Sequence, residues 1–177
     1  LQAAWLVCKQ LGISAAEFLQ SMQNFTGAAK RLELMASNQI TRVYRDFAHA
    51  PSKVTATLLA IRQQFPQQHI IAVLELHTFS SLNEQFMHEY NHSLNAADKA
   101  VVFYSAHALE LKKLPPLTKE KVQEGFNRKD LTVIQDKTEL LNWLQNQDYS
   151  NTVLLLMSSG TFDGADILTF AKTITAD

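Results

Sequence analysis

One short segment of the sequence carries residue types that could hold a catalytic metal. His88, Glu89 and His92 in "HEYNH" have the H-E-x-x-H spacing, in which two histidines one helical turn apart bind zinc and the glutamate activates a water molecule. A zinc hydrolase also needs a third protein ligand at a suitable spacing downstream. The only histidine after this segment is His107, so the ligand set is incomplete.

The pattern around the two histidines also argues against zinc. The segment has an apolar residue at every fourth position, namely Leu82, Phe86, Tyr90 and Leu94. This spacing predicts a crossover helix that lays one face on a sheet. At about 100° per residue, His88 and His92 then point away from that face, toward solvent. We therefore expect two exposed histidines and no metal site.

A second group of reactive residue types lies at the ends of predicted strands. In open α/β sheets, ligands bind beyond the carboxyl ends of the strands, and here these ends are polar. The residues are Asp46 and His49, then Glu75, His77, Thr78 and Ser80, then Tyr104, Ser105 and His107, and finally Ser158, Ser159 and Gly160. Taken singly, each could be an ordinary cap or turn residue. Their recurrence after several strands favours a binding site, although it names no reaction.

The elements that must position these residues follow from the apolar pattern. Four continuous apolar runs are separated by segments of helical periodicity: "HIIAVLEL", "KAVVFY", "LTVIQD" and "TVLLLMSS". Continuous runs indicate strands that are covered on both faces, as in parallel sheets. Upstream, "LELMAS" and "QITRVYRDF" are close enough to pair as a hairpin around Ser37 and Asn38. The sequence therefore predicts an α/β fold with a Rossmann-like, mostly parallel sheet, flanking helices and an antiparallel hairpin at its edge.

Two helices are predicted before this domain. The first ends at Gly12, a residue suited to the left-handed position after a helix. The second begins with Ser14 and Glu17 at capping-box spacing. The sequence opens inside the first of these helices, which we interpret as the start of a segment from a longer protein.

Composition excludes several classes of protein. The 177 residues include 16 basic and 17 acidic side chains, for a net charge of -1, so no overall field would attract nucleic acid or an anionic membrane. No apolar run reaches the roughly 20 residues of a membrane span. Cys8 is the only cysteine, which excludes an internal disulfide and suits a reducing cytoplasm.

Five short motifs follow one another along the chain: "FTGAAKRLE", "DFAHAP", "LELHTFSS", "AADKAVVF" and "LLLMSSGTF". Their succession resembles that of the Mur ligases, the ATP-dependent amide-bond ligases of peptidoglycan synthesis. The resemblance implies that residues 1–29 are the helical tail of the family's central ATPase domain, and that residues 30–177 are its C-terminal, Rossmann-like domain. It also implies ATP and Mg²⁺ as cofactors, bound mainly by the central domain, and UDP-N-acetylmuramic acid and a peptide as substrates.

The resemblance assigns roles on the nucleotide side of the site. Ligases of this family phosphorylate a substrate carboxylate, and an amine then displaces the phosphate. A cation is needed where charge develops on the transferred group, and Arg31, from the family's hinge motif, is the candidate. Asp46 and His49 of the "DFAHAP" motif are expected to help place the nucleotide. The family usually has an acidic residue where this chain has Arg45.

On the peptide side, the resemblance points to two loops. His77, Thr78 and Ser80 lie in one of them, and Ser158, Ser159 and Phe162 lie in the other. The "MSSGTF" segment is more similar to that of the tripeptide-recycling ligases than to that of the ligases that add L-alanine. We expect it to precede a helix directly, so that the serine hydroxyls lie at the helix N-terminus and can bind an anionic group, with Phe162 packed beside the peptide. The alternative is that these serines only cap the helix.

One motif of the reaction is missing. The sequence contains no G-x-x-x-x-G-K-[ST] phosphate loop, so we expect the chain to be inactive alone and to act as a substrate-binding lid. L-Alanine stays open as the amine substrate instead of L-alanyl-γ-D-glutamyl-meso-diaminopimelate. A non-catalytic Rossmann-like binding module is the other alternative, because a fold does not fix a function.

Overall fold

The computed structural model describes residues 2–25 and 27–176, and its centre is a six-stranded sheet. In the order β1-β2-β6-β3-β4-β5, every neighbouring pair is parallel except β1 and β2. The strands are β1 (Glu33–Ser37), β2 (Thr41–Asp46), β3 (His69–Glu75), β4 (Lys99–Phe103), β5 (Thr132–Ile134) and β6 (Thr152–Met157). The predicted α/β class, the four parallel strands and the edge hairpin are confirmed.

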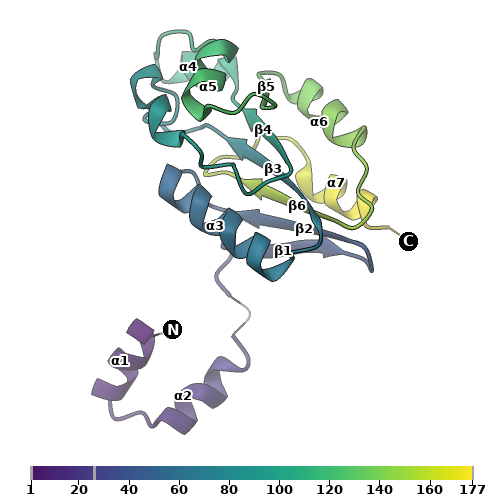
Figure 1. The fold of residues 1–177 in the computed structure, drawn as a ribbon. Helices are drawn as coiled ribbons and strands as arrows, with labels where there is room; N and C mark the ends of the chain where they lie inside the picture. The colour runs from purple at the N-terminus through teal and green to yellow at the C-terminus, as the bar shows by residue number, and fades with distance from the viewer. Residues whose placement is uncertain (1, 26, 177) are drawn as a thin grey trace.

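Helices cover both faces of the sheet. They are α3 (Pro51–Gln64), η1 (Glu84–Tyr90), α4 (Ala106–Leu111), α5 (Lys119–Phe126), α6 (Lys137–Gln145) and α7 (Ile167–Ile174). Figure 1 shows α3 in front of the sheet and α6 and α7 behind it. Each side has its own apolar core: Leu58 of α3 belongs to one, and Phe170 of α7 belongs to the other.

The central strands have continuous apolar runs between their ends because both of their faces are covered. In β3, Ile70 and Ala72 pack with α3, whereas Ile71 and Val73 pack on the side of α6 and α7. All four side chains are fully buried, and burying a valine or isoleucine side chain stabilises a fold by about 1.5–3 kcal/mol. This rigid sheet fixes the positions of the loops at its carboxyl end.

The two-helix leader is also present, as α1 (Gln2–Gln10) and α2 (Ala15–Met22). Gly12 between them has a φ of 79°, and the Ser14 and Glu17 side chains form both bonds of the predicted capping box. Trp5 packs against Phe18 with ring centroids 5.3 Å apart. None of the described residues in these helices is buried, and Figure 1 shows the pair apart from the α/β domain.

The prediction of a crossover helix around "HEYNH" is wrong. The segment forms the short 3₁₀ helix η1, which the Asn83 side chain caps by accepting from Gln85 N–H at 2.9 Å. It ends at Tyr90, because Asn91 has non-helical angles, with a φ of -49° and a ψ of 127°, and His92 is left-handed, with a φ of 61°. Asparagine side chains such as that of Asn83 bond to nearby backbone groups and compete with helical hydrogen bonds. His88 and His92 are exposed, as expected.

Candidate functional site

Two groups of polar residues meet at the carboxyl edge of the sheet. We call the first the hinge cluster; it consists of Lys30, Arg31, Leu32, Asp46, Phe47 and His49. We call the second the Glu75 cluster; it consists of Glu75, His77, Ser158, Gly160 and Phe162. The two clusters adjoin because β2 and β6 are neighbours, and Ser158 N–H donates to the Asp46 carbonyl at 3.0 Å.

The centre of the Glu75 cluster is a buried carboxylate at the end of β3. The Glu75 side chain is 2% exposed, and its Oε2 accepts from Phe162 N–H at 2.9 Å and from the Ser158 hydroxyl. His77 Nδ1 lies 3.7 Å from Oε1. A buried carboxylate is tolerated only with such donors, so Glu75 ties the loop after β6 to the end of β3. The polar pattern included Glu75 among the strand ends but gave it no role.

The backbone of Gly160 packs directly against the side chains of His77 and Glu75. A Cβ at this position would lie 2.7 Å from His77 Cγ and 2.9 Å from Glu75 Oε2, well inside contact distance. Gly160 N–H also donates to Ser158 Oγ at 2.7 Å. The sequence showed this glycine after the serines, but only the fold reveals that a side chain has no room here.

The loop after β6 differs from the prediction in one respect. A run of left-handed residues at Phe162, Asp163 and Gly164 separates the serines from α7, whose N-cap is Asp166. The serines therefore neither cap that helix nor lie at its N-terminus. Ser159 Oγ is buried and has no hydrogen-bond partner among the described residues.

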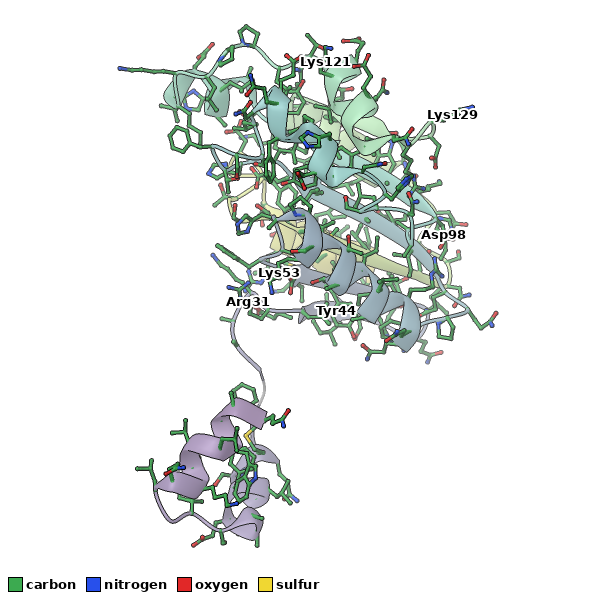
Figure 2. All side chains as sticks on the ribbon, turned by 60° about the vertical axis from the view of Figure 1, so that its left-hand side comes forward. Arg31, Tyr44, Lys53, Asp98, Lys121 and Lys129 are labelled. Atoms are coloured by element: carbon green, nitrogen blue, oxygen red, sulfur yellow. The ribbon has the colours of Figure 1, made fainter. Side chains whose placement is uncertain are left out.

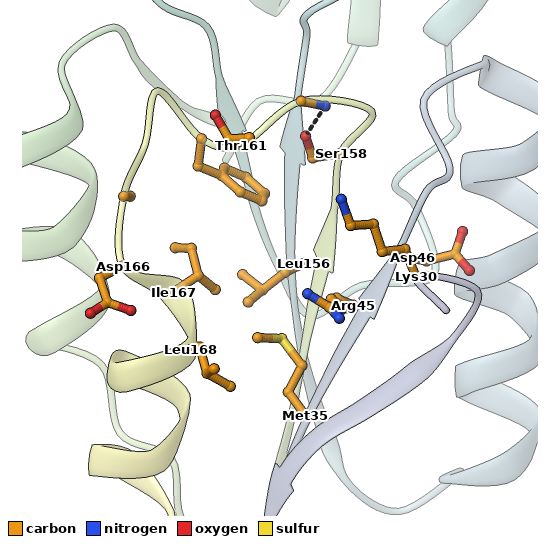
Figure 3. A pocket seen from close by; sticks show the side chains of 13 residues that line it. Lys30, Met35, Arg45, Asp46, Leu156, Ser158, Thr161, Asp166, Ile167 and Leu168 are labelled. Carbon is orange, nitrogen blue, oxygen red and sulfur yellow. Dashed lines mark hydrogen bonds between the residues drawn. The ribbon is translucent and has the colours of Figure 1, made fainter. Parts of the chain in front are cut away.

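Phe162 is held in the protein core. Its ring is 6% exposed and lies 6.2 Å, centroid to centroid, from that of Phe103. It forms part of the wall of a pocket of about 250 Å³ between the β1–β2 hairpin and the start of α7. Figure 3 shows this pocket, with Leu156 and Met35 on its apolar side and Lys30 and Arg45 on its cationic side.

The hinge cluster is organised by Asp46 at the end of β2. Its Oδ2 accepts from Leu32 N–H at 2.6 Å, and its Oδ1 accepts from Ala48 N–H at 2.7 Å. Phe47 N–H donates to the Lys30 carbonyl at 2.8 Å. These bonds hold Lys30 and Leu32 in the left-handed region, at φ values of 56° and 44°. Thus the Asp46 carboxylate fixes the backbone after Arg31, and Phe47 N–H fixes it before Arg31.

Arg31 and His49 both contact the ring of Phe47. Arg31 Cζ lies 4.7 Å from the ring centroid, and the His49 ring meets it edge-on, with centroids 5.3 Å apart. Figure 2 places Arg31 where the leader joins the α/β domain. The sequence identified Arg31, Asp46 and His49, and the structure brings all three together, but the part played by Phe47 was missed.

Arg45, the position at which the chain departs from the usual motif, forms a paired ion bridge. Its Nε and Nη2 donate to the two carboxylate oxygens of Glu33, each at 2.9 Å. Lys30 N–H adds a bond to Glu33 at 2.7 Å. The hydrogen bonds from Arg45, followed by the one from Lys30, lower the pKa of Glu33. This bridge fastens the β1–β2 hairpin beside the hinge.

The remaining polar residues at the strand ends form hydrogen bonds with nearby parts of the chain. The Thr78 hydroxyl bonds to the Ser80 and Ser81 hydroxyls at 3.2 and 2.9 Å, which shapes the loop after β3. Ser105 caps α4, and the Tyr104 hydroxyl donates to the Leu117 carbonyl at 2.6 Å. At the end of β4, Ser105 is thus an ordinary cap residue, and Tyr104 is a core residue whose hydroxyl is paired.

Within residues 2–25 and 27–176, no three His, Cys, Asp or Glu side chains lie close enough together to form a metal site. None of the helices in the same residues is long and apolar enough to cross a membrane.

The fold and the polar carboxyl edge define a Rossmann-like α/β domain whose hinge presents an exposed arginine. Comparison with known proteins identifies its family: residues 30–160 match the Mur ligase, glutamate ligase domain, and the chain belongs to the Mur ligases. Residues 30–160 span both clusters, from Lys30 to Gly160, except for Phe162.

Individual relatives carry two different names. A UDP-N-acetylmuramate–L-alanine ligase of Renibacterium salmoninarum is 33% identical over 168 residues, which cover 94% of this chain and 35% of the relative. The chain thus spans about a third of the length of that relative. A crystallised domain assigned to a UDP-N-acetylmuramate:L-alanyl-γ-D-glutamyl-meso-diaminopimelate ligase of Haemophilus ducreyi is 31% identical, with a TM-score of 0.61; the match covers 82% of this chain and 100% of that one.

A further solved structure shares the fold at low identity. The murein peptide ligase of Psychrobacter arcticus superposes with a TM-score of 0.65 at 18% identity, over 93% of this chain and 34% of the other. At this identity the comparison supports the α/β architecture alone.

Proposed function

We propose that this chain is the C-terminal domain of an ATP-dependent ligase that joins L-alanyl-γ-D-glutamyl-meso-diaminopimelate to UDP-N-acetylmuramic acid in peptidoglycan recycling in the cytoplasm. Residues 1–29 belong to the preceding central domain, which binds most of the ATP and Mg²⁺. In this proposal, the hinge cluster serves the nucleotide and the Glu75 cluster serves the peptide.

The observation that carries the proposal is the separation of two chemically different clusters on one edge. An exposed arginine lies in the hinge cluster, and a loop fixed by the buried Glu75 lies beside the half-exposed His77. A ligase of this type needs both: a cation for the transferred phosphoryl group and a rigid surface that orients the amine. His77, Thr78, Ser80, Ser158, Ser159 and Phe162 are the residues proposed to form or support that surface.

The reaction proceeds in two balanced steps. The γ-phosphoryl group of ATP passes to the carboxylate of UDP-N-acetylmuramic acid, and ADP leaves. The amine of the peptide then attacks the acyl carbon, phosphate leaves and the amine loses a proton, which gives the amide. Arg31 stabilises charge in the first step. Asp46, whose carboxylate accepts from Leu32 and Ala48 N–H, acts on nucleotide placement by fixing the hinge.

A second candidate is an L-alanine ligase, because the Renibacterium salmoninarum relative with that name is 33% identical over most of this chain. It would share the fold, the hinge chemistry and the acyl phosphate. Only the amine substrate would differ.

Competition between the two amines tests the proposal. The intact ligase is supplied with UDP-N-acetylmuramic acid, ATP, and equal concentrations of the tripeptide and L-alanine, and both products are quantified by mass spectrometry. We expect the tripeptide product to dominate. A dominant L-alanine product would establish the second candidate, and no ADP formation with either amine would favour a non-catalytic binding module.

The isolated chain provides a second test. Because the phosphate loop is absent from its sequence, residues 1–177 should not hydrolyse ATP and should bind it only weakly. Tight ATP binding in calorimetry would contradict the assignment of nucleotide binding to another domain.

A further inference from the structure

We propose that Phe47 is a positioning residue for Arg31: its ring holds the guanidinium over the hinge while leaving the N–H donors of that group free for the phosphoryl oxygens. This inference rests on the proposed role of Arg31 in phosphoryl transfer. It adds a residue whose part in the reaction the motif pattern did not indicate.

The first observation is that the Arg31 guanidinium packs on the Phe47 ring. The Arg31 side chain is exposed, and Cζ lies 4.7 Å from the Phe47 ring centroid. Within residues 2–25 and 27–176, no hydrogen bond or ion pair of the guanidinium accompanies this contact. A long side chain of this kind otherwise samples many rotamers, so the ring is what restricts it.

The second observation is that Phe47 is itself held from several directions. Its N–H donates to the Lys30 carbonyl, and its own carbonyl lies 2.9 Å from His49 Nδ1. The His49 ring packs edge-on against it at an interplanar angle of 86°. His49 is anchored in turn by the buried Tyr90, whose hydroxyl donates to the His49 carbonyl at 2.5 Å. The ring therefore has a defined place before any ligand binds.

The neighbouring arginine shows why an aromatic partner suits this role. Arg45 donates Nε–H and Nη2–H to the two carboxylate oxygens of Glu33. Arg45 would have to break this paired bridge in order to bind another anion through the same donors. An aromatic face attracts a guanidinium through its quadrupole and takes none of its five N–H donors. Arg31 is thus oriented but keeps its charge and its donors available.

Phe47→Leu in the full-length ligase removes the aromatic face and keeps an apolar side chain. A cation–π contact that becomes desolvated in the closed site corresponds to about a 5- to 30-fold effect, so we expect kcat for ADP formation to fall by about that factor. The KM for UDP-N-acetylmuramic acid should change by less than about twofold. Phe47→Trp, which restores an aromatic face, should recover most of the loss.

Phe65→Leu is the matched control. Phe65 carries the other arginine stack of the domain, with Arg42 Cζ 5.3 Å from its centroid, but it follows α3 and lies outside both clusters. This variant loses the same type of contact and should keep kcat near that of the parent enzyme. Melting temperatures of both variants separate a loss of folding from a loss of positioning.

A double-variant cycle decides whether Phe47 acts through Arg31. If it does, Phe47→Leu should slow the parent enzyme but have little further effect on Arg31→Ala. Equal factors in both backgrounds, or a Phe47→Leu enzyme as fast as the parent, would overturn the inference. If Arg31→Ala itself leaves kcat unchanged, the proposed role of Arg31 fails instead, so the two failures are distinguishable.

Discussion

The hinge cluster and the Glu75 cluster lie on the same edge of one sheet but are built in opposite ways. In the Glu75 cluster, a carboxylate that is 2% exposed accepts from Ser158 and Phe162, and Gly160 packs directly against it. In the hinge cluster, the charged group is exposed and rests on one aromatic ring. The charge of the Glu75 cluster is paired within this domain, whereas the arginine of the hinge cluster faces solvent.

This difference matches the roles that we propose for the two clusters. A buried charge is stable only if donors surround it, which makes the Glu75 cluster rigid and costly to alter. An exposed arginine costs the fold little, because its charge stays hydrated. The Arg31 charge contributes a favourable interaction only when an anion binds beside it. We therefore expect changes in the hinge cluster to affect turnover, and changes in the Glu75 cluster to affect stability.

The largest expected effect is on turnover. Arg31→Ala in the full-length ligase should lower kcat on the order of 10³-fold, as for other arginines that stabilise a transferred phosphoryl group. Binding of the UDP-sugar and the melting temperature should change little, because the charge is needed only in the transition state. Steady-state kinetics and calorimetry measure the two effects. Equal losses of UDP-sugar binding and of turnover would contradict the prediction that the hinge cluster acts on turnover alone.

The largest expected effect on stability comes from Glu75. Glu75→Met leaves Phe162 N–H and the Ser158 hydroxyl without their acceptor, and each unpaired buried group costs about 1–3 kcal/mol. We expect the free energy of unfolding in urea to fall by about 2–4 kcal/mol in total. Glu33→Met, which removes a carboxylate of the exposed bridge with Arg45, should cost less than about 1 kcal/mol. Similar losses in the two variants would show that burial does not distinguish them.

Much of the fold could be predicted because it depends on local patterns. Continuous apolar runs identified the parallel strands, and Ser14 with Glu17 identified the start of α2. The α-helix predicted around Tyr90 failed because the apolar stripe identifies buried positions, such as Leu82 and Leu94, but does not fix the helix type; a 3₁₀ helix has three residues per turn. The side chain of Asn83 and the left-handed His92 decided the outcome.

The sequence assigned roles only to candidate residues that lie within recognisable motifs. Arg31, Asp46 and His49 are close in sequence to recognisable hinge and strand-end patterns. Glu75 and Phe162 are 87 positions apart, and their bond depends on the pairing of β3 with β6, which a single sequence does not reveal. In the same way, no sequence pattern shows that a ring such as Phe47 lies under Arg31.

Gly160 offers a smaller test of the rigidity of the Glu75 cluster. Gly160→Ala places a methyl group against His77 and Glu75, and overpacking of this kind costs about 1–3 kcal/mol. Gly164→Ala is the comparison: its Cβ would meet nothing within 4 Å, but its φ of 72° strains any side chain, at about 1–2 kcal/mol. Unfolding in urea compares the two. Only Gly160→Ala should also shift the NMR signals of the His77 ring.

The smallest expected effect concerns the bridge beside the hinge. Hydrogen bonds from Arg45 and then Lys30 lower the pKa of Glu33 from its ordinary value of 4.5. Because the folded pKa is the lower one, the bridge stabilises the fold above about pH 4.5, and this contribution is lost as the pH falls through the folded pKa. The Glu33 and Arg45 side chains are 35% and 38% exposed, so solvent screens the pair and the contribution is about 0.5 kcal/mol.

Glu33→Gln should therefore unfold at a slightly lower urea concentration than the parent at pH 7, and the difference should shrink below about pH 4.5. It should also shrink in 1 M salt, because the charges are near the surface. Glu110→Gln, which changes an exposed glutamate outside both clusters, controls for the change in net charge. A difference that is equal at pH 7 and pH 3 would mean that Glu33 acts through packing and not through its charge.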